Sequence, residues 1–115
     1  MTTVSLNHMA EAMQVHPRTV LRYLHNDRNY GWDEGDNPDV SVEKVAKAFD
    51  CKASTLKRAL EGRDELLKPA EAAKEVGVQH IRSFWKQNHK PVIRIGGVTR
   101  FSRLDMVNWL FANRI

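Results

Sequence analysis

The sequence predicts a mostly α protein built from two small lobes of paired helices, the second of which also holds a β-hairpin. Apolar residues recur at helical spacing over residues 6–24. The same spacing returns 36 positions later, so that Met9 matches Val45 and Val20 matches Leu56. Two short alternating runs surround the pair Gly96-Gly97, which is typical of a hairpin.

The length of the chain limits how it divides into domains. With 115 residues it fits one domain or two very small ones, because domains below roughly 60 residues are only marginally stable alone. We expect lobes at 1–62 and 66–115 that share an interface, joined by the polar stretch Glu61–Glu65.

Nothing in the sequence predicts a membrane span or secretion. No apolar run approaches the ~20 residues that cross a bilayer, and residues 1–4 do not begin a secretion signal. The single Cys51 excludes an internal disulfide, and its apolar surroundings predict a reduced, buried thiol. We therefore expect a cytoplasmic protein.

The net charge of +4 is unevenly distributed. Residues 66–115 carry nine Lys or Arg against three acids, whereas residues 1–62 carry eight against nine. Because phosphate neutralisation supplies most nonspecific affinity for nucleic acid, the C-terminal half is predicted to be the stronger phosphate-binding surface. A modest basic excess also serves solubility alone.

The first helix pair has the spacing of a helix-turn-helix. Ser5 is placed to cap a helix over 6–13, and Pro17 suits the first turn of a helix over 17–25. Gln14 stands where the turn needs a left-handed residue, a place that Gly usually takes. The second helix of such a unit can enter the major groove of DNA, although any small two-helix core meets the same template. Its predicted contact residues are His16, Arg18, Thr19 and Arg22.

A loop over residues 26–39 follows, rich in turn formers and in acids. Tyr30 and Trp32 are its only apolar residues, and we expect them to anchor it to the core, with stacking on a sugar or base as the alternative. Either a hairpin wing or an irregular loop fits. Its acids argue against contact with phosphate: Asp33, Glu34, Asp36 and Asp39.

The second helix pair repeats the first. Ser41 caps a helix over 42–49, Asp50 takes the turn, and Gly62 ends a helix over 53–60. This unit either reads DNA too or only completes the N-terminal core, and the second role is favoured because ~25 residues have no core of their own. Its predicted contact residues are Ser54, Thr55, Lys57 and Arg58.

The C-terminal half predicts helices over 67–76 and 79–87, a hairpin over 91–101 and a last helix capped by Ser102. A two-residue turn in the hairpin would mix polar and apolar residues on one face. We predict a three-residue turn, pairing Ile93 with Phe101 and Arg94 with Arg100, because the buried face fixes register. The last helix is expected to bury Leu104, Val107, Leu110 and Phe111.

Several segments of this half resemble the winged-helix DNA-binding domain of the excisionase/MerR-like family, over about residues 66–111. The resemblance rests on Leu66–Ala73, Gly77-Val78, Val92–Gly97, Arg100-Phe101, Leu104-Asp105 and Trp109-Leu110. It implies a winged helix-turn-helix with a recognition helix over 79–87 and a wing along the adjacent backbone or minor groove. Because the N-terminal half also resembles a divergent helix-turn-helix, we expect tandem helix-turn-helix lobes of which the C-terminal one is winged. The residues implied are Gln79, His80, Arg82, Ser83 and Lys86 in the helix, and Arg94, Thr99 and Arg100 in the wing.

These observations predict a sequence-specific, double-stranded DNA-binding protein: a transcriptional regulator or an excisionase-type factor of a phage or mobile element. A homodimer or head-to-tail copies on DNA fit equally well. The alternative is a protein-interaction adaptor, whose near-neutral N-terminal lobe binds a protein partner while only the C-terminal lobe contacts DNA. We expect no enzyme, cofactor, metal or membrane contact, because zinc-ligand spacing and phosphate-binding Gly loops are missing from the sequence.

Overall fold

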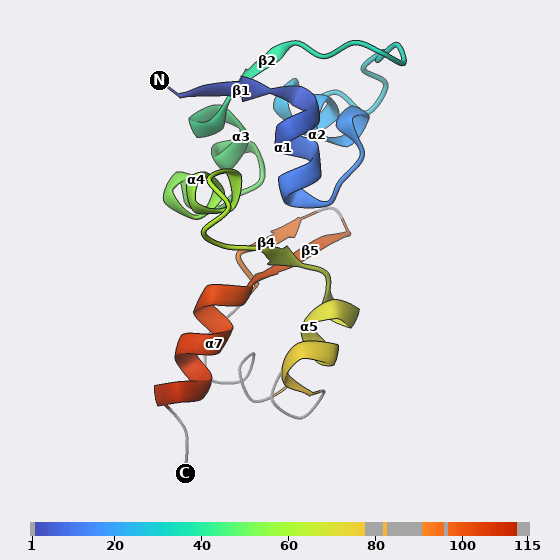
Figure 1. Cartoon of the computed structure of the whole chain (residues 1–115). Helices are drawn as coiled ribbons and strands as arrows, with labels where there is room; N and C mark the ends of the chain where they lie inside the picture. The colour runs from blue at the N-terminus through green and yellow to red at the C-terminus, as the bar shows by residue number, and fades with distance from the viewer. Residues whose placement is uncertain (1, 78–81, 83–90, 96, 113–115) are drawn as a thin grey trace.

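The helices lie in two groups on either side of a small three-stranded sheet (Figure 1). The computed structural model describes residues 2–77, 82, 91–95 and 97–112. One group contains α1 (Leu6–Met13), α2 (Pro17–Leu24), α3 (Val42–Ala48) and α4 (Ala53–Leu60). The other contains α5 (Pro69–Val76) and α7 (Arg103–Ala112). The described chain is thus mainly helical, with small antiparallel sheets.

Two separate sheets hold the strands. At the N-terminal end β1 (Thr3–Ser5) pairs antiparallel with β2 (Asp39–Ser41). The three-stranded sheet has the order β3-β5-β4, with bounds β3 (Leu66–Leu67), β4 (Ile93–Ile95) and β5 (Val98–Ser102). Both of its pairings are antiparallel.

The repeat predicted from the sequence is present as two copies related by an approximate two-fold axis. In the β1–β2 pair Val4 lies opposite Val40, its own equivalent at the 36-residue offset. The backbone bonds around the pair obey the same symmetry: the Leu6 N–H donates to Pro38 O at 2.8 Å, and the equivalent Val42 N–H donates to Thr2 O at 2.9 Å. The copies therefore face each other as the subunits of a symmetric dimer do.

The two copies use the same local devices. The Ser5 and Ser41 hydroxyls accept from the N–H groups of His8 and Lys44, at 3.2 and 3.3 Å, and so cap α1 and α3. Gln14 and Asp50 take left-handed φ values of 55° and 52° after these helices, which confirms the predicted turns. This left-handed conformation is sterically unfavourable for both residues because each has a side chain.

Each copy buries apolar residues against the other. One cluster holds Leu6, Met9 and Met13 together with Val45 and Phe49, all fully buried. This confirms that the second helix pair completes the N-terminal core. The same cluster continues into Leu66 and Ile93 of the three-stranded sheet, whereas a second cluster lies on the other side: Leu67, Ala72, Phe101, Met106 and Trp109.

The hairpin register differs from the predicted one. Ile93 pairs with Arg100, Arg94 with Thr99 and Ile95 with Val98, around a two-residue turn. The prediction assumed one buried and one exposed face. Strand β5 is instead covered on both faces, with Arg100 and its neighbour Phe101 both buried. The alternation of polar and apolar residues along the strand therefore cannot predict how β4 and β5 pair.

Arg100 was expected on the wing surface, and that expectation is wrong. Its side chain is buried between the helix groups, where Nε donates to Met13 O at 2.8 Å and Nη2 to Gln14 O at 2.5 Å. A third bond runs from Nη1 to Thr99 O at 2.6 Å. Burial lowers the pKa of this guanidinium, which Glu71 partly opposes. Arg100 therefore satisfies the carbonyls at the end of α1 that a helix leaves unpaired.

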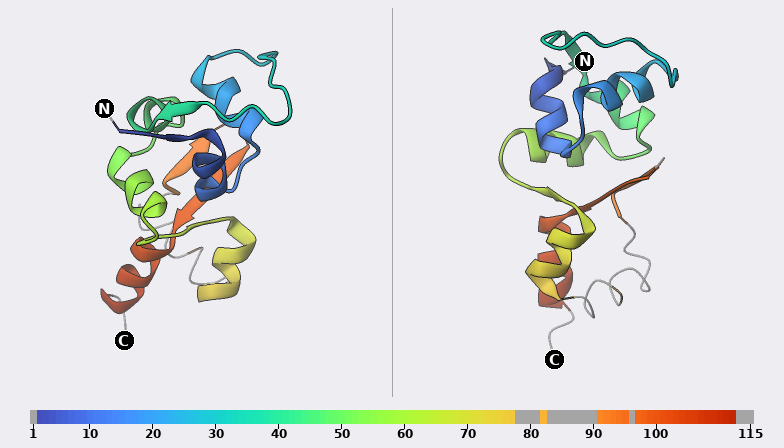
Figure 2. Two further views of the ribbon diagram at one scale, coloured as in Figure 1. Left: turned by 45° about the horizontal axis from the view of Figure 1, so that its top comes forward. Right: turned by 90° about the vertical axis from the view of Figure 1, so that its right-hand side faces the viewer.

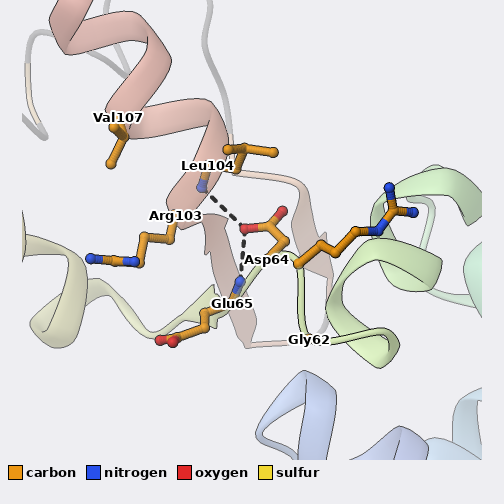
Figure 3. Close-up of a pocket in the computed structure, with 7 residues that line it drawn as sticks. Gly62, Asp64, Glu65, Arg103, Leu104 and Val107 are labelled. Carbon is orange, nitrogen blue, oxygen red and sulfur yellow. Dashed lines mark hydrogen bonds between the residues drawn. The ribbon is translucent and has the colours of Figure 1, made fainter.

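The predicted linker is also part of the packed structure. The Asp64 side chain is buried and accepts from the Ser102 hydroxyl at 2.6 Å and from the Leu104 N–H at 3.1 Å. Figure 3 shows it turned toward the start of α7, beside a shallow hollow that Arg103 also lines. Asp64 thus fixes the N-terminus of α7, together with Ser102, whose hydroxyl accepts from the Asp105 N–H as predicted.

Two helix predictions need correction. Leu67 belongs to β3 and does not start a helix, because its backbone pairs with β5, and α5 begins at Pro69. The inner face of the last helix differs in part from the predicted one: Met106 and Trp109 are buried and Leu110 packs against them, while Leu104 and Phe111 are 37% and 66% exposed. The helix is apolar on both sides, so periodicity could not select the inner one.

We predict that Arg100→Met lowers the free energy of unfolding by about 3 kcal/mol, because buried carbonyls lose charged donors. Urea denaturation followed by circular dichroism measures this. Arg103→Ala, which removes an exposed pair with Glu75, serves as the control and should cost under about 1 kcal/mol. Equal effects of the two changes would contradict the role given to Arg100.

Asp64→Asn should destabilise the protein by about 2 kcal/mol, because the amide cannot accept all the bonds that the buried carboxylate accepts. The control is Asp33→Asn in the exposed loop, which should leave the urea midpoint unchanged. A neutral Asp64→Asn would show that the linker contributes no stability.

Candidate nucleic-acid interface

Helix α2 presents a polar outer face. The His16 ring caps the helix through Nδ1, which accepts from the Arg18 N–H at 3.1 Å, and Pro17 occupies the first position. Val20 and Leu21 are buried on the inner side. This phase leaves Arg18 exposed, with Thr19 and Arg22 partly exposed beside it, as the sequence predicted.

The arginines of α2, Arg18 and Arg22, lie outside the close ion pairs of the described residues. Arg22 Nε is buried without an acceptor, but so is Nε of the equivalent Arg58, and the two helices do not differ in this respect. Exposed cations outside ion pairs are suited to bind an anion.

The equivalent helix α4 differs in its ion pairs. Arg58, which matches Arg22, pairs with Asp64 at 3.4 Å and with Asp105 at 3.5 Å. Lys57 lies 3.9 Å from Glu43. Thr55 is only 4% exposed, so its predicted contact with DNA is wrong. Of the contact residues predicted in α4, Ser54 alone is both exposed and outside these pairs.

The acidic loop lies along α2. Trp32 packs edge-on against the His16 ring with centroids 5.1 Å apart, and Tyr30 stacks on His25 at 4.1 Å. Both aromatics also pack against the N-terminal core, which confirms the predicted anchoring. The four predicted acids all follow Trp32 and are exposed, so one flank of α2 is negatively charged.

The hairpin borders the other flank. Tyr23, the residue after Arg22, donates from its hydroxyl to Ile95 O at 3.5 Å. Ile95 and Val98 pack on the N-terminal core, and the hairpin extends beneath the helices of that core (Figure 2). Arg94 is exposed on this hairpin, with Thr99 opposite it and partly exposed.

The predicted recognition helix of the C-terminal half falls largely outside the described residues. Arg82 is described and exposed. The other positions implied by the family resemblance lie outside that part of the chain: Gln79, His80, Ser83 and Lys86.

We also searched the described residues for a metal site, a reactive thiol and a membrane-spanning helix. They contain no group of three or more His, Cys, Asp or Glu side chains that could hold a metal ion. Desolvation raises the pKa of the Cys51 thiol to about 11, with a smaller effect from Asp50. None of the described helices is both long and apolar enough to cross a membrane.

Comparison of the chain with models of protein families, with curated proteins and with solved structures found no match.

We predict that native Cys51 reacts with iodoacetamide about 100-fold more slowly at pH 8 than the same thiol in the urea-unfolded chain. The thiolate is the reactive form, and a pKa raised from 9.0 to about 11 reduces its fraction by that factor. Mass spectrometry of the alkylated peptide over time gives both rates. Similar rates would show that the thiol is not shielded by the fold.

Proposed function

We propose that the chain is a sequence-specific, double-stranded DNA-binding protein built from tandem helix-turn-helix units, with α2 as a helix that reads the major groove. The observation that carries this proposal is the contrast between equivalent helices: Arg18 and Arg22 take no part in the ion pairs of the described residues, whereas Arg58 is held by two carboxylates. Exposed cations can also serve solubility, so the proposal depends on the position of these two on the outer face of the second helix of a helix-turn-helix.

The spacing of the two arginines suits a duplex. Residues four apart lie on one face of a helix, ~6 Å from each other, and an Arg can bind the O6 and N7 atoms of guanine in a bidentate manner. Each such pair discriminates against other bases by ~1–3 kcal/mol. Thr19 lies between them and can contact a phosphate or a base edge.

The family resemblance of residues 66–111 extends the proposal. It supports a winged helix-turn-helix in the C-terminal half and a role as a transcriptional regulator or excisionase-type factor of a phage or mobile element. DNA is then the principal partner, with no cofactor and no catalysis, and the site of action is the cytoplasm. Further copies of the chain on adjacent half-sites are compatible with this role.

The alternative function is a protein-interaction adaptor whose N-terminal half binds a protein. It is favoured by the exposed acids beside α2, because Asp33, Glu34 and Asp36 repel phosphate. A basic partner surface would instead be attracted to them. In that case only the C-terminal half contacts DNA.

We expect the double change Arg18→Ala/Arg22→Ala to weaken binding at least ~10-fold and to reduce the preference for the selected duplex over an unrelated one, because base contacts carry the sequence preference. The ligand is a duplex selected from a random library by the wild-type protein, and fluorescence anisotropy with this duplex and an unrelated one gives both quantities. Lys44→Ala/Lys47→Ala removes two exposed cations of α3 and is the matched control.

The outcomes separate the two functions. Loss confined to the α2 variant supports DNA reading by α2. Equal loss in both variants indicates nonspecific attraction to a basic protein. Unchanged binding by the α2 variant favours the adaptor, and failure of the wild-type protein to select any duplex overturns the proposal.

A further inference from the structure

The hairpin of β4 and β5 is fixed to the first helix pair, not only to its own half. Ile93 belongs to the N-terminal core cluster, and Ile95 and Val98 pack against it. Arg100 ties β5 to the carbonyls of Met13 and Gln14, in the turn between α1 and α2. The position of the hairpin relative to α2 is therefore set by buried contacts.

The free end of the hairpin meets α2 on a defined flank. The Tyr23 hydroxyl reaches Ile95, the last residue of β4 before the turn. On a helix Tyr23 lies beside Thr19, four residues earlier, and follows Arg22 directly. The hairpin end thus adjoins the side of α2 that carries Thr19, while Tyr30 of the acidic loop holds the His25 side.

We propose that the β4–β5 hairpin is the wing of α2: when α2 lies in the major groove, Arg94 and Gly97 contact the sugar-phosphate backbone beside that groove segment. This inference rests on the proposed function. It differs from the family resemblance, which pairs the same hairpin with a recognition helix over residues 79–87.

The charges on the two flanks of α2 favour contact between DNA phosphates and the hairpin. The loop on one flank of α2 exposes Asp33, Glu34 and Asp36, and phosphates avoid it. The hairpin on the other flank exposes Arg94 and, around a turn with Gly97 at a φ of +86°, carries no acid between Ile93 and Ser102. A duplex on α2 is therefore oriented with its nearer phosphates against the hairpin.

Cleavage by a tethered metal complex tests this arrangement. Cys51→Val removes the natural thiol, and Val15 at the equivalent position shows that this side chain fits such a site. An iron–EDTA group is then attached to the protein through Thr99→Cys. The control tether is Asn108→Cys, an exposed site on α7 beyond the sheet from α2 (Figure 1).

We expect the tether at 99 to cut the selected duplex directly beside the base pairs whose protection is lost in the Arg18→Ala/Arg22→Ala protein. The tether at 108 should not cut there. Cuts from 99 lying more than about half a helical turn away, ~5 base pairs, would overturn the wing assignment while leaving DNA reading by α2 intact.

Affinity provides an independent readout. Arg94→Ala should weaken binding ~5-fold and lower the salt slope by about 0.9, as expected for one phosphate contact. Arg94→Lys should retain most of the affinity, because a phosphate accepts either cation, and Lys47→Ala should change little. Normal binding by Arg94→Ala overturns the wing, whereas wild-type protein that binds no duplex overturns the proposed function and the wing together.

Discussion

The buried guanidinium of Arg100 is the interaction on which the arrangement of the two halves depends. It reaches across the boundary to Met13 O and Gln14 O, while its own strand holds β3 and β4. The Gln14 side chain adds two bonds across the same boundary: Nε2 donates to Leu66 O at 2.8 Å and to Glu71 Oε1. A turn that belongs to the first helix pair thereby becomes the junction with the sheet.

This junction explains why equivalent residues of the two copies have different surroundings. The turn of the first copy binds Arg100, and Arg18 and Arg22 of α2 stay outside the ion pairs of the described residues. The second copy leads through Asp64 into β3, so the adjoining residue Arg58 is drawn into contact with α7. The two copies of the repeat thus share one fold, and their surroundings differ where residues 64–112 join them.

Much of the N-terminal fold could be predicted from the sequence, because its signals are local. Ser5, Ser41 and Pro17 mark helix starts, and the apolar spacing marks a core that encloses both copies. The hairpin register and the inner face of α7 could not be predicted in this way. In both, apolar residues occur on two sides, and long-range packing decides which side is inner.

In the candidate site, too, local features could be predicted from the sequence and long-range contacts could not. Arg18 and Arg22 were found because the phase of an amphipathic helix places them outward. The burial of Arg100 and the pairing of Arg58 with Asp64 depend on residues 86 and 6 positions away, for which the sequence holds no periodic signal. A cation in a predicted contact set is therefore informative only once its carboxylate and carbonyl neighbours are known.

The approximate two-fold axis through Val4 and Val40 also bears on how the protein assembles. A helix pair of this size that folds as a free subunit must find its packing partner by diffusion, and its stability then rises with concentration. Here the partner is covalently attached. The N-terminal core is complete within one chain, so its folding is a first-order event that proceeds equally well when only a few molecules are present in a cell.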